Sequence, residues 1–167
     1  DFLELENEII VYGSNVILNI SKDDFGYKKI VLERETNINY STLAKLPDET
    51  IAVGTYSHGL FLLNLKDSTF SKFTGFKNYP IPDNLNIEAT LIDKYNRLWI
   101  ATYGRGVYVI NFENKIIENF LVQGNNPYAL HYNDNLSLFE DFTGNIWVGS
   151  QSCSQLRFWS KPTDNAK

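Results

Sequence analysis

The chain repeats itself with a period of a little under fifty residues, and this repetition limits the folds that it can adopt. Residues 55–64 align with residues 102–111, which lie 47 positions later, and the apolar positions match throughout the two segments. Residues 98–102 align in the same way with residues 146–150, which lie 48 positions later. A weaker copy opens the chain at residues 9–20. Repeats of this length that are built from short strands are typical of β-propeller blades.

The composition of each repeat favours strands. Short runs rich in Val, Ile, Phe, Tyr and Trp are separated by Gly, Asn and Asp, and no window has an apolar 3.6-residue period long enough for an ordinary helix. Residues 60–63 and 107–110 are apolar at every position. Strands of that kind are covered on both faces, as blades stacked between neighbours must be. The sequence therefore predicts an all-β protein made of β-propeller blades, each with four antiparallel strands.

We predict three complete blades and three strands of a fourth, which together form one propeller segment over residues 1–160. A polar tail follows at residues 161–167. Within a blade, strands are named A to D from the propeller axis outward. The blades are expected at about residues 1–36, 37–84, 85–130 and 131–160. The predicted strands cover residues 2–5, 9–12, 16–20, 27–32, 40–46, 50–54, 60–65, 70–76, 87–93, 98–102, 107–112, 116–122, 136–140, 146–150 and 155–159.

The two ends of such a segment would leave apolar blade faces and an unpaired strand edge exposed, which is a liability for a protein in water. We therefore expect an arc of a larger ring, or an arc that associates with a second protomer. A compact ring of four blades is the alternative.

The net charge, the apolar runs and the few Cys and His residues exclude several classes of partner. The formal net charge is -5 and no basic stripe is present, so no nucleic-acid binding is expected. The longest strongly apolar run, residues 60–63, is too short to cross a bilayer, so this segment is not expected to contact a membrane. The single Cys153 and the two histidines, His58 and His131, lack metal-ligand spacing. We expect neither a metal nor a cofactor.

Two segments resemble the signature of two-component regulator propeller repeats. Residues 141–150 read Asp-Phe-Thr-Gly-Asn-Ile-Trp-Val-Gly-Ser, and residues 93–102 read Asp-Lys-Tyr-Asn-Arg-Leu-Trp-Ile-Ala-Thr. The Gly-Arg-Gly-Val at residues 104–107 is similar to the glycine-rich hairpin of these repeats, and residues 125–130 are similar to the segment between their blades. The resemblance is strong over residues 46–159 and degenerate before them.

Two departures from the pattern affect single blades. Residues 51–53 lack the tryptophan of the later copies, and residues 151–154 replace the usual glycine cluster.

Repeats of this family build the periplasmic sensor region of hybrid two-component histidine kinases, whose members commonly respond to oligosaccharides or their breakdown products. The resemblance therefore implies a non-catalytic, periplasmic sensor segment of an inner-membrane histidine kinase. It implies an oligosaccharide or related small molecule as ligand, and further blades or a second protomer as partner, with a homo-oligomer expected. A protein–protein interaction propeller is the alternative, and a propeller hydrolase or lyase is a more distant one.

Residues that recur in each repeat are expected to serve the blade. Asp93 and Asp141 occupy the same point of the repeat, where an aspartate accepts backbone N–H groups in a tight turn. Trp99 and Trp147 also recur and are expected to pack between blades. Ser57 lies beside His58, but no nucleophile-elbow pattern surrounds it. We therefore expect no catalytic residue.

Residues that differ from blade to blade are better candidates for a binding site. Propeller geometry places the B–C turns and the D–A connections on one face, while the repetitive A–B turns lie on the other. Aromatic rings stack on sugars, and Arg or His side chains bind hydroxyl or carboxylate groups. Arg105 leads because the flanking Gly104 and Gly106 leave it unobstructed. The alternative is that these loops are simply polar and exposed. The candidate ligand-binding residues are Arg105, Tyr103, Tyr56, His58, Tyr128 and His131.

Overall fold

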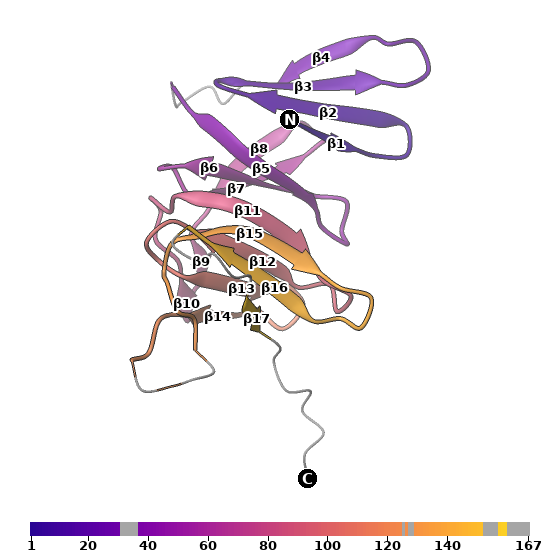
Figure 1. Ribbon diagram of the computed structural model, residues 1–167. Coiled ribbons are helices and arrows are strands. Elements are labelled where there is room, and N and C mark those ends of the chain that lie inside the picture. The colour runs from indigo at the N-terminus through magenta and orange to yellow at the C-terminus, as the bar shows by residue number, and fades with distance from the viewer. Residues whose placement is uncertain (31–36, 125, 127–128, 152–156, 160–167) are drawn as a thin grey trace.

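The computed structural model describes residues 1–30, 37–124, 126, 129–151 and 157–159. The described residues form no helix. They form antiparallel sheets that follow one another in chain order from the N-terminus to the C-terminus (Figure 1). Three sheets have four strands and one has three, each with its strands in simple sequence order. The predicted all-β propeller architecture is confirmed.

The four main sheets are named blades one to four. Blade one contains β1 (Phe2–Glu4), β2 (Glu8–Gly13), β3 (Val16–Ser21) and β4 (Tyr27–Ile30). Blade two contains β5 (Asn39–Lys45), β6 (Ile51–Tyr56), β7 (Leu60–Asn64) and β8 (Thr69–Phe73). Blade three contains β11 (Ile87–Ile92), β12 (Leu98–Thr102), β13 (Val107–Asn111) and β14 (Ile116–Phe120). Blade four contains β15 (Asn135–Glu140), β16 (Ile146–Ser150) and β17 (Arg157–Trp159).

The outer strand of blade two differs from its predicted span of residues 70–76. Strand β8 ends at Phe73, and a separate two-stranded hairpin follows, made of β9 (Gly75–Phe76) and β10 (Tyr79–Pro80). Gly75 has a φ of 94°, a left-handed conformation that ends the extended strand. Phe76 then packs beside Phe112 of blade three, with ring centroids 6.1 Å apart. The hairpin therefore fills space along the next blade.

Each inner strand of blades two to four carries a β-bulge that the sequence did not predict. The pairing with the second strand skips one residue at equivalent points of the three blades, namely at Ser41, Glu88 and Leu136. A bulge of this kind bends its strand and increases the local twist. Because the bulge recurs at equivalent points of three blades, it is a regular structural feature of these blades.

The hydrophobic core lies between the blades. One buried cluster joins blades one and two, a second joins blades two and three, and a third joins blades three and four. The sheets of blades two and three therefore bury both of their faces. This explains why some of their strands are apolar at every position. The middle strands are the most deeply buried, with Ile51, Ala52 and Val53 fully inside.

Gly54 lies where blades two and three come close together. A Cβ atom at Gly54 would lie 2.6 Å from Cγ2 of Thr42 in its own blade and 2.7 Å from Cγ2 of Ile87 in blade three. No side chain fits there without moving its neighbours. The equivalent residues of the later blades, Ala101 and Gly149, are also small.

Candidate functional site

The B–C turns and the D–A connections meet at one end of the blades, called here the loop rim. Backbone hydrogen bonds join each turn to the connection that follows its blade. The amide of Gly59 donates to Leu85 (3.1 Å), and the amide of Gly106 donates to Asn133 (3.0 Å). Asn15 of blade one donates in the same way to the carbonyl of Ile38 (2.8 Å). The loop rim is therefore held by a repeated backbone contact.

Buried threonines fix the shape of two of these turns. The Thr55 hydroxyl donates to the carbonyl of Gly59, and the Thr102 hydroxyl donates to the carbonyl of Gly106, both at 2.7 Å. Both threonines are fully buried. The residues between them and the glycines are thus presented from a rigid base.

Two B–C turns share one anchoring segment, Leu85–Asn86. Gly59 of blade two donates to the carbonyl of Leu85, and Tyr103 of blade three donates to the carbonyl of Asn86 (2.9 Å). The turn that carries Tyr56 and His58 is therefore linked through two adjacent residues to the turn that carries Tyr103 and Arg105. The structure brings these four candidate residues to one region of the loop rim.

The exposure of the candidates suits contact with a ligand. Tyr56 is 41% exposed and Tyr103 is 46% exposed, while Arg105 and His131 are exposed and His58 is half-buried. Tyr128 lies outside the described residues. His131 belongs to the connection before blade four.

The pKa shifts of two buried tyrosines indicate where the side chains of Arg105 and Tyr56 lie. Burial raises the pKa of Tyr108, and the nearby positive charge of Arg105 opposes this rise. Burial also raises the pKa of Tyr12, and the neighbouring phenol of Tyr56 adds to the effect. Tyr108 is part of the buried cluster between blades two and three. Arg105 therefore lies over that junction, whereas Tyr56 extends toward blade one.

Asn86 is a candidate that the sequence did not reveal. Its Oδ1 atom is buried and has no hydrogen-bond partner in the part of the chain that the structure describes. A buried polar atom without a partner costs free energy, so it needs an explanation. Asn86 lies between the two linked turns, and its Oδ1 atom is out of reach of solvent in this conformation.

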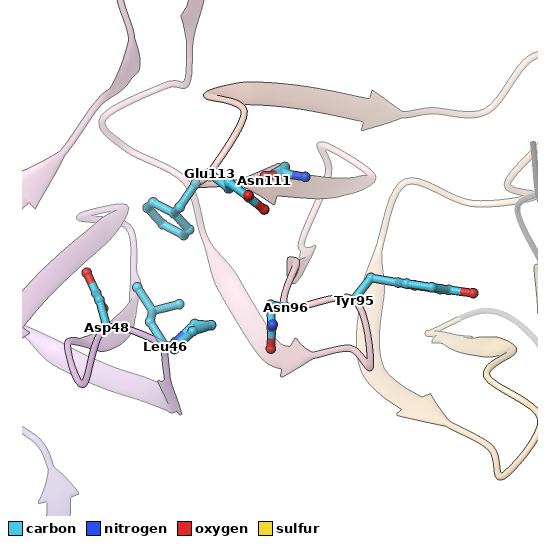
Figure 2. A pocket seen from close by; sticks show the side chains of 8 residues that line it. Leu46, Asp48, Tyr95, Asn96, Asn111 and Glu113 are labelled. Atoms are coloured by element: carbon cyan, nitrogen blue, oxygen red, sulfur yellow. The ribbon is translucent and has the colours of Figure 1, made fainter.

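The opposite end of the blades, called here the turn rim, carries the A–B and C–D turns and contains hollows between the blades. A cavity of about 370 Å³ lies there between blades two and three. Figure 2 shows Leu46 and Asp48 on one side of it and Asn96 on another, with the Tyr95 ring pointing away from Leu46 and Asp48. Glu113 adds a second carboxylate to the lining.

An equivalent hollow of about 420 Å³ lies at the turn rim between blades one and two. Its lining includes Leu5, Asn64 and Lys66, which match Leu46, Asn111 and Glu113 of the neighbouring cavity in their place in the blade. Because the hollow recurs between successive blades, it is a consequence of how the blades splay apart.

The recurring aspartates have the structural role that the sequence predicts. Asp93 is buried and accepts from the amides of Tyr95 and Arg97, the Nε of Arg97 (2.7 Å) and the indole of Trp99 (2.7 Å). All of these donors lie in the same turn or in the strand after it. The carboxylate is therefore fully used within its own blade.

Asp141 repeats this arrangement in blade four. Its carboxylate accepts from the Thr143 hydroxyl, the amides of Thr143 and Asn145, and the Trp147 indole (2.9 Å). The Thr143 hydroxyl, with help from the Trp147 and Asn145 donors, holds the pKa of Asp141 well below its usual range. A turn carboxylate whose pKa is lowered in this way is poorly suited to act as a general acid near neutral pH.

Trp99 packs between blades as predicted. Its side chain is 1% exposed and lies in the buried cluster between blades three and four. Its ring stacks on Phe120, with centroids 6.3 Å apart and planes 12° from parallel.

The sheets, their order and the aspartate–tryptophan turns together define a segment of a β-propeller. Residues 80–104 match the family described as two component regulator propeller. This match includes the Asp93 turn and Trp99, so the resemblance found in the sequence is confirmed there. No curated protein matches the chain.

Solved structures share this fold at low sequence identity. The chain superimposes with a TM-score of 0.73 and 19% identity on the extracellular domain of a protein described as the hybrid two component system BT4673 from B. thetaiotaomicron. The corresponding domain of BT3049 from the same organism gives a TM-score of 0.67 and 24% identity. These matches cover 89% and 90% of this chain but only 20% and 18% of those chains. The chain thus spans about a fifth of their length.

A third similar structure is an enzyme, a catalytically inactive H270A variant of virginiamycin B lyase from Staphylococcus aureus with quinupristin. Its TM-score is 0.68 at 13% identity, with 99% of this chain and 56% of that chain covered. At this identity the likeness concerns the fold alone.

Two further findings concern the described residues. They contain no group of three or more His, Cys, Asp or Glu side chains that could hold a metal ion. No helix among them has the length and apolar character needed to cross a bilayer.

Proposed function

We propose that this chain is a non-catalytic, ligand-binding segment of an extracytoplasmic sensor propeller. Its ligand is an oligosaccharide or a related small molecule, and it binds at the loop rim over the junction of blades two and three. The segment is periplasmic and belongs to the sensor region of a hybrid two-component histidine kinase.

The shared anchor Leu85–Asn86 is the observation that carries this proposal. Two turns from different blades are bonded to it, so the backbones of the two turns keep a fixed spacing without a ligand. Rigid placement lowers the entropic cost of binding. Variable residues on a rigid scaffold are the usual arrangement in a specific site.

The chemistry of these side chains favours a sugar. Tyr103 offers a flat apolar ring, and Arg105 offers several N–H donors. A saccharide has apolar ring faces edged by hydroxyl groups, which are both donors and acceptors. An acidic sugar would add an ion pair with Arg105.

The sensor role rests on the repeat and on the type of protein that shares the fold. The match at residues 80–104 is to a regulator propeller, and two similar solved structures are extracellular domains. The recurring carboxylates Asp93 and Asp141 are engaged in turns, which supports binding without turnover.

A binding screen followed by point variants tests the proposal. The purified chain is screened against plant, host and microbial oligosaccharides, and binding to any positive compound is measured by calorimetry. Arg105→Ala and Tyr103→Ala should each weaken binding more than about tenfold, which is about 1.4 kcal/mol. Both are exposed loop changes, so the free energy of unfolding should change by no more than about 1 kcal/mol.

Tyr95→Ala is the matched control, because Tyr95 is also an exposed tyrosine but lies on the turn rim. It should leave binding unchanged. Normal binding by both loop-rim variants, or a ligand mapped beside Asn96 in the turn-rim cavity, would contradict the assigned site. Turnover of a glycan would contradict the non-catalytic role.

A further inference from the structure

The anchor between blades two and three is repeated between blades three and four. Gly106 of blade three donates its amide proton to the carbonyl of Asn133 (3.0 Å), and Gln151 of blade four donates to the carbonyl of Asp134 (3.1 Å). The segment Asn133–Asp134 lies 48 positions after Leu85–Asn86 and joins two turns in the same way. We call the loop rim around Leu85–Asn86 the first junction and the loop rim around Asn133–Asp134 the second junction.

Side-chain hydrogen bonds hold the connection at the second junction. Asn135 is fully buried, and its side-chain amide donates to the carbonyl of Tyr132 (3.3 Å). The Oδ1 atom of Asn135 accepts from the hydroxyl of Ser150 in the second strand of blade four (2.9 Å). The Oδ1 atom of Asn133 accepts from the amide of Val122, which follows the outer strand of blade three (3.0 Å). The connection is therefore bonded to both blades of the junction before any ligand is present.

Two side chains of this connection are accessible to a ligand. Tyr132 is 39% exposed, and Asp134 is half-buried. The carboxylate of Asp134 has no hydrogen bond or ion pair with any other residue that the structure describes. Its Oδ1 atom lies 3.9 Å from the point that a Cβ atom at Gly104 would occupy, so no side chain at this position covers it. A carboxylate is a strong acceptor for hydroxyl donors.

Arg105 lies between the two junctions. Burial raises the pKa of Tyr108 in the cluster between blades two and three, and the charge of Arg105 opposes this rise. The residue after Arg105 is Gly106, which is bonded to Asn133 at the second junction. The guanidinium of Arg105 has no ion pair within the described part of the chain. It is therefore placed to contact a ligand that extends from one junction to the other.

Both blades of the second junction belong to this chain. Trp99 of blade three is buried there with Ile146 and Val148 of blade four. Further blades of a longer propeller would stack beside blade four and would not enter between blades three and four. The second junction is therefore bounded by residues of this chain, whatever the number of blades in the ring.

We propose that Tyr132 and Asp134 form a second sugar-binding subsite, and that the ligand is a linear oligosaccharide that spans both junctions across Arg105. This inference rests on the proposed function and extends its site by one blade. Packed sheets lie about 10 Å apart, so a single sugar unit is too short to reach both junctions. The Tyr132 ring packs on an apolar sugar face, and Asp134 accepts hydrogen bonds from sugar hydroxyl groups.

A size series of oligosaccharides, measured by calorimetry, tests the second subsite. The chain is titrated with gluco-, xylo-, galacto- and arabino-oligosaccharides, each from the monosaccharide to the hexasaccharide. In a class that binds, the hexasaccharide should bind more than about tenfold more tightly than the monosaccharide. Tyr132→Ala and Asp134→Ala should each remove most of this gain, because they remove contacts that only a longer compound makes. Tyr103→Ala should weaken the binding of every length.

Glu113→Ala is the matched control for the Asp134 change, because Glu113 is an exposed carboxylate on the turn rim. It should leave the gain with length intact. Both subsite variants keep the backbone carbonyls of the connection, and circular dichroism verifies their folding; if one is unfolded, the other decides.

The outcomes separate this inference from the proposed function. Equal affinity for all lengths, or a gain that survives in both Tyr132→Ala and Asp134→Ala, would overturn the second subsite while the first junction stands. Absence of binding by every compound would contradict the proposed sugar site itself and this extension with it.

Discussion

Blades three and four carry the same aspartate–tryptophan turn in different surroundings. Asp93 and Asp141 each accept a hydrogen bond from the indole six residues later, at 2.7 and 2.9 Å. Trp99 is buried because blade four covers it, whereas Trp147 is only half-buried among the described residues of blade four. The turn therefore forms within one blade, while the burial of its tryptophan is supplied by the next blade. In blade three the hydrogen bond of the turn and the burial of its tryptophan act together. In blade four the hydrogen bond is present with less burial, so the two contributions to stability can be measured separately.

Replacement of the two tryptophans should give the largest difference. Trp99→Ala opens a cavity between two blades and should lower the free energy of unfolding by about 3–5 kcal/mol. Trp147→Ala removes a half-buried ring and should cost roughly 1–2 kcal/mol. Urea unfolding of the two variants measures both costs. Equal costs would show that the covering blade adds nothing to the burial of Trp99.

The glycines at equivalent points of the second strands allow the same comparison between blades two and four. Gly54→Ala brings a methyl group against Thr42 and Ile87 and should cost about 1–3 kcal/mol. Gly149→Ala at the equivalent point of blade four faces an open hollow and should change stability by less than about 0.5 kcal/mol. Thermal unfolding of the two variants provides the measurement. If Gly149→Ala lowers stability as much as Gly54→Ala, the need for a small residue arises within the strand itself and not from contact with the next blade.

Loss of the acceptor at the turn rim should have a smaller effect. Glu140→Ala removes the hydrogen bonds from the Lys94 amide and should cost about 0.5–1 kcal/mol. Hydrogen exchange at the Lys94 amide should become faster, since its bond to blade four is gone. Glu140→Gln keeps an acceptor oxygen and should retain much of the protection. Unchanged exchange in Glu140→Ala would contradict this interblade bond.

Acid should act on blade four through Asp141 with the smallest effect on stability, because this carboxylate is only half-buried. Its pKa is lowered in the folded state from an ordinary value of 3.8. Its stabilisation is therefore complete above that value and is lost as the pH falls toward the lowered one. The unfolding free energy of Asp141→Asn should depend less on pH than that of the wild type below about pH 5. Parallel pH profiles would argue against the Thr143 and Trp147 bonds.

Most of the fold could be predicted because each blade contains its own local signals. The Asp-to-Trp spacing and the doubly apolar strands identified the second and third strands to within about two residues at each end. The span assigned to residues 70–76 was too long because Phe76 is as apolar as a strand residue, and only the conformation of Gly75 ends the strand. The bulge at Glu88 has no local sequence signal, since it arises from the pairing of two strands.

For the candidate site, the sequence could predict only which loops contribute to it and not the contacts between those loops. The sequence identified the B–C turns that carry Tyr56 and Arg105, because loop position follows from strand order. It could not show that Leu85–Asn86 joins two turns, since those bonds involve backbone atoms of distant residues. It also gave no indication that the Asn86 oxygen lacks a partner, which is a property of the folded chain.

The bulges of the inner strands have a consequence for how such a protein can diversify. Ser41, Glu88 and Leu136 are respectively small and polar, acidic, and apolar, although they hold the same point of three repeats. A bulged residue has no cross-strand partner, so substitution there leaves the pairing of its neighbours intact. Burial raises the pKa of Glu88, so the environment of this position already alters the chemistry of its side chain. Evolution can therefore vary the innermost strands of blades two to four at one position while the repeat that folds each blade stays fixed.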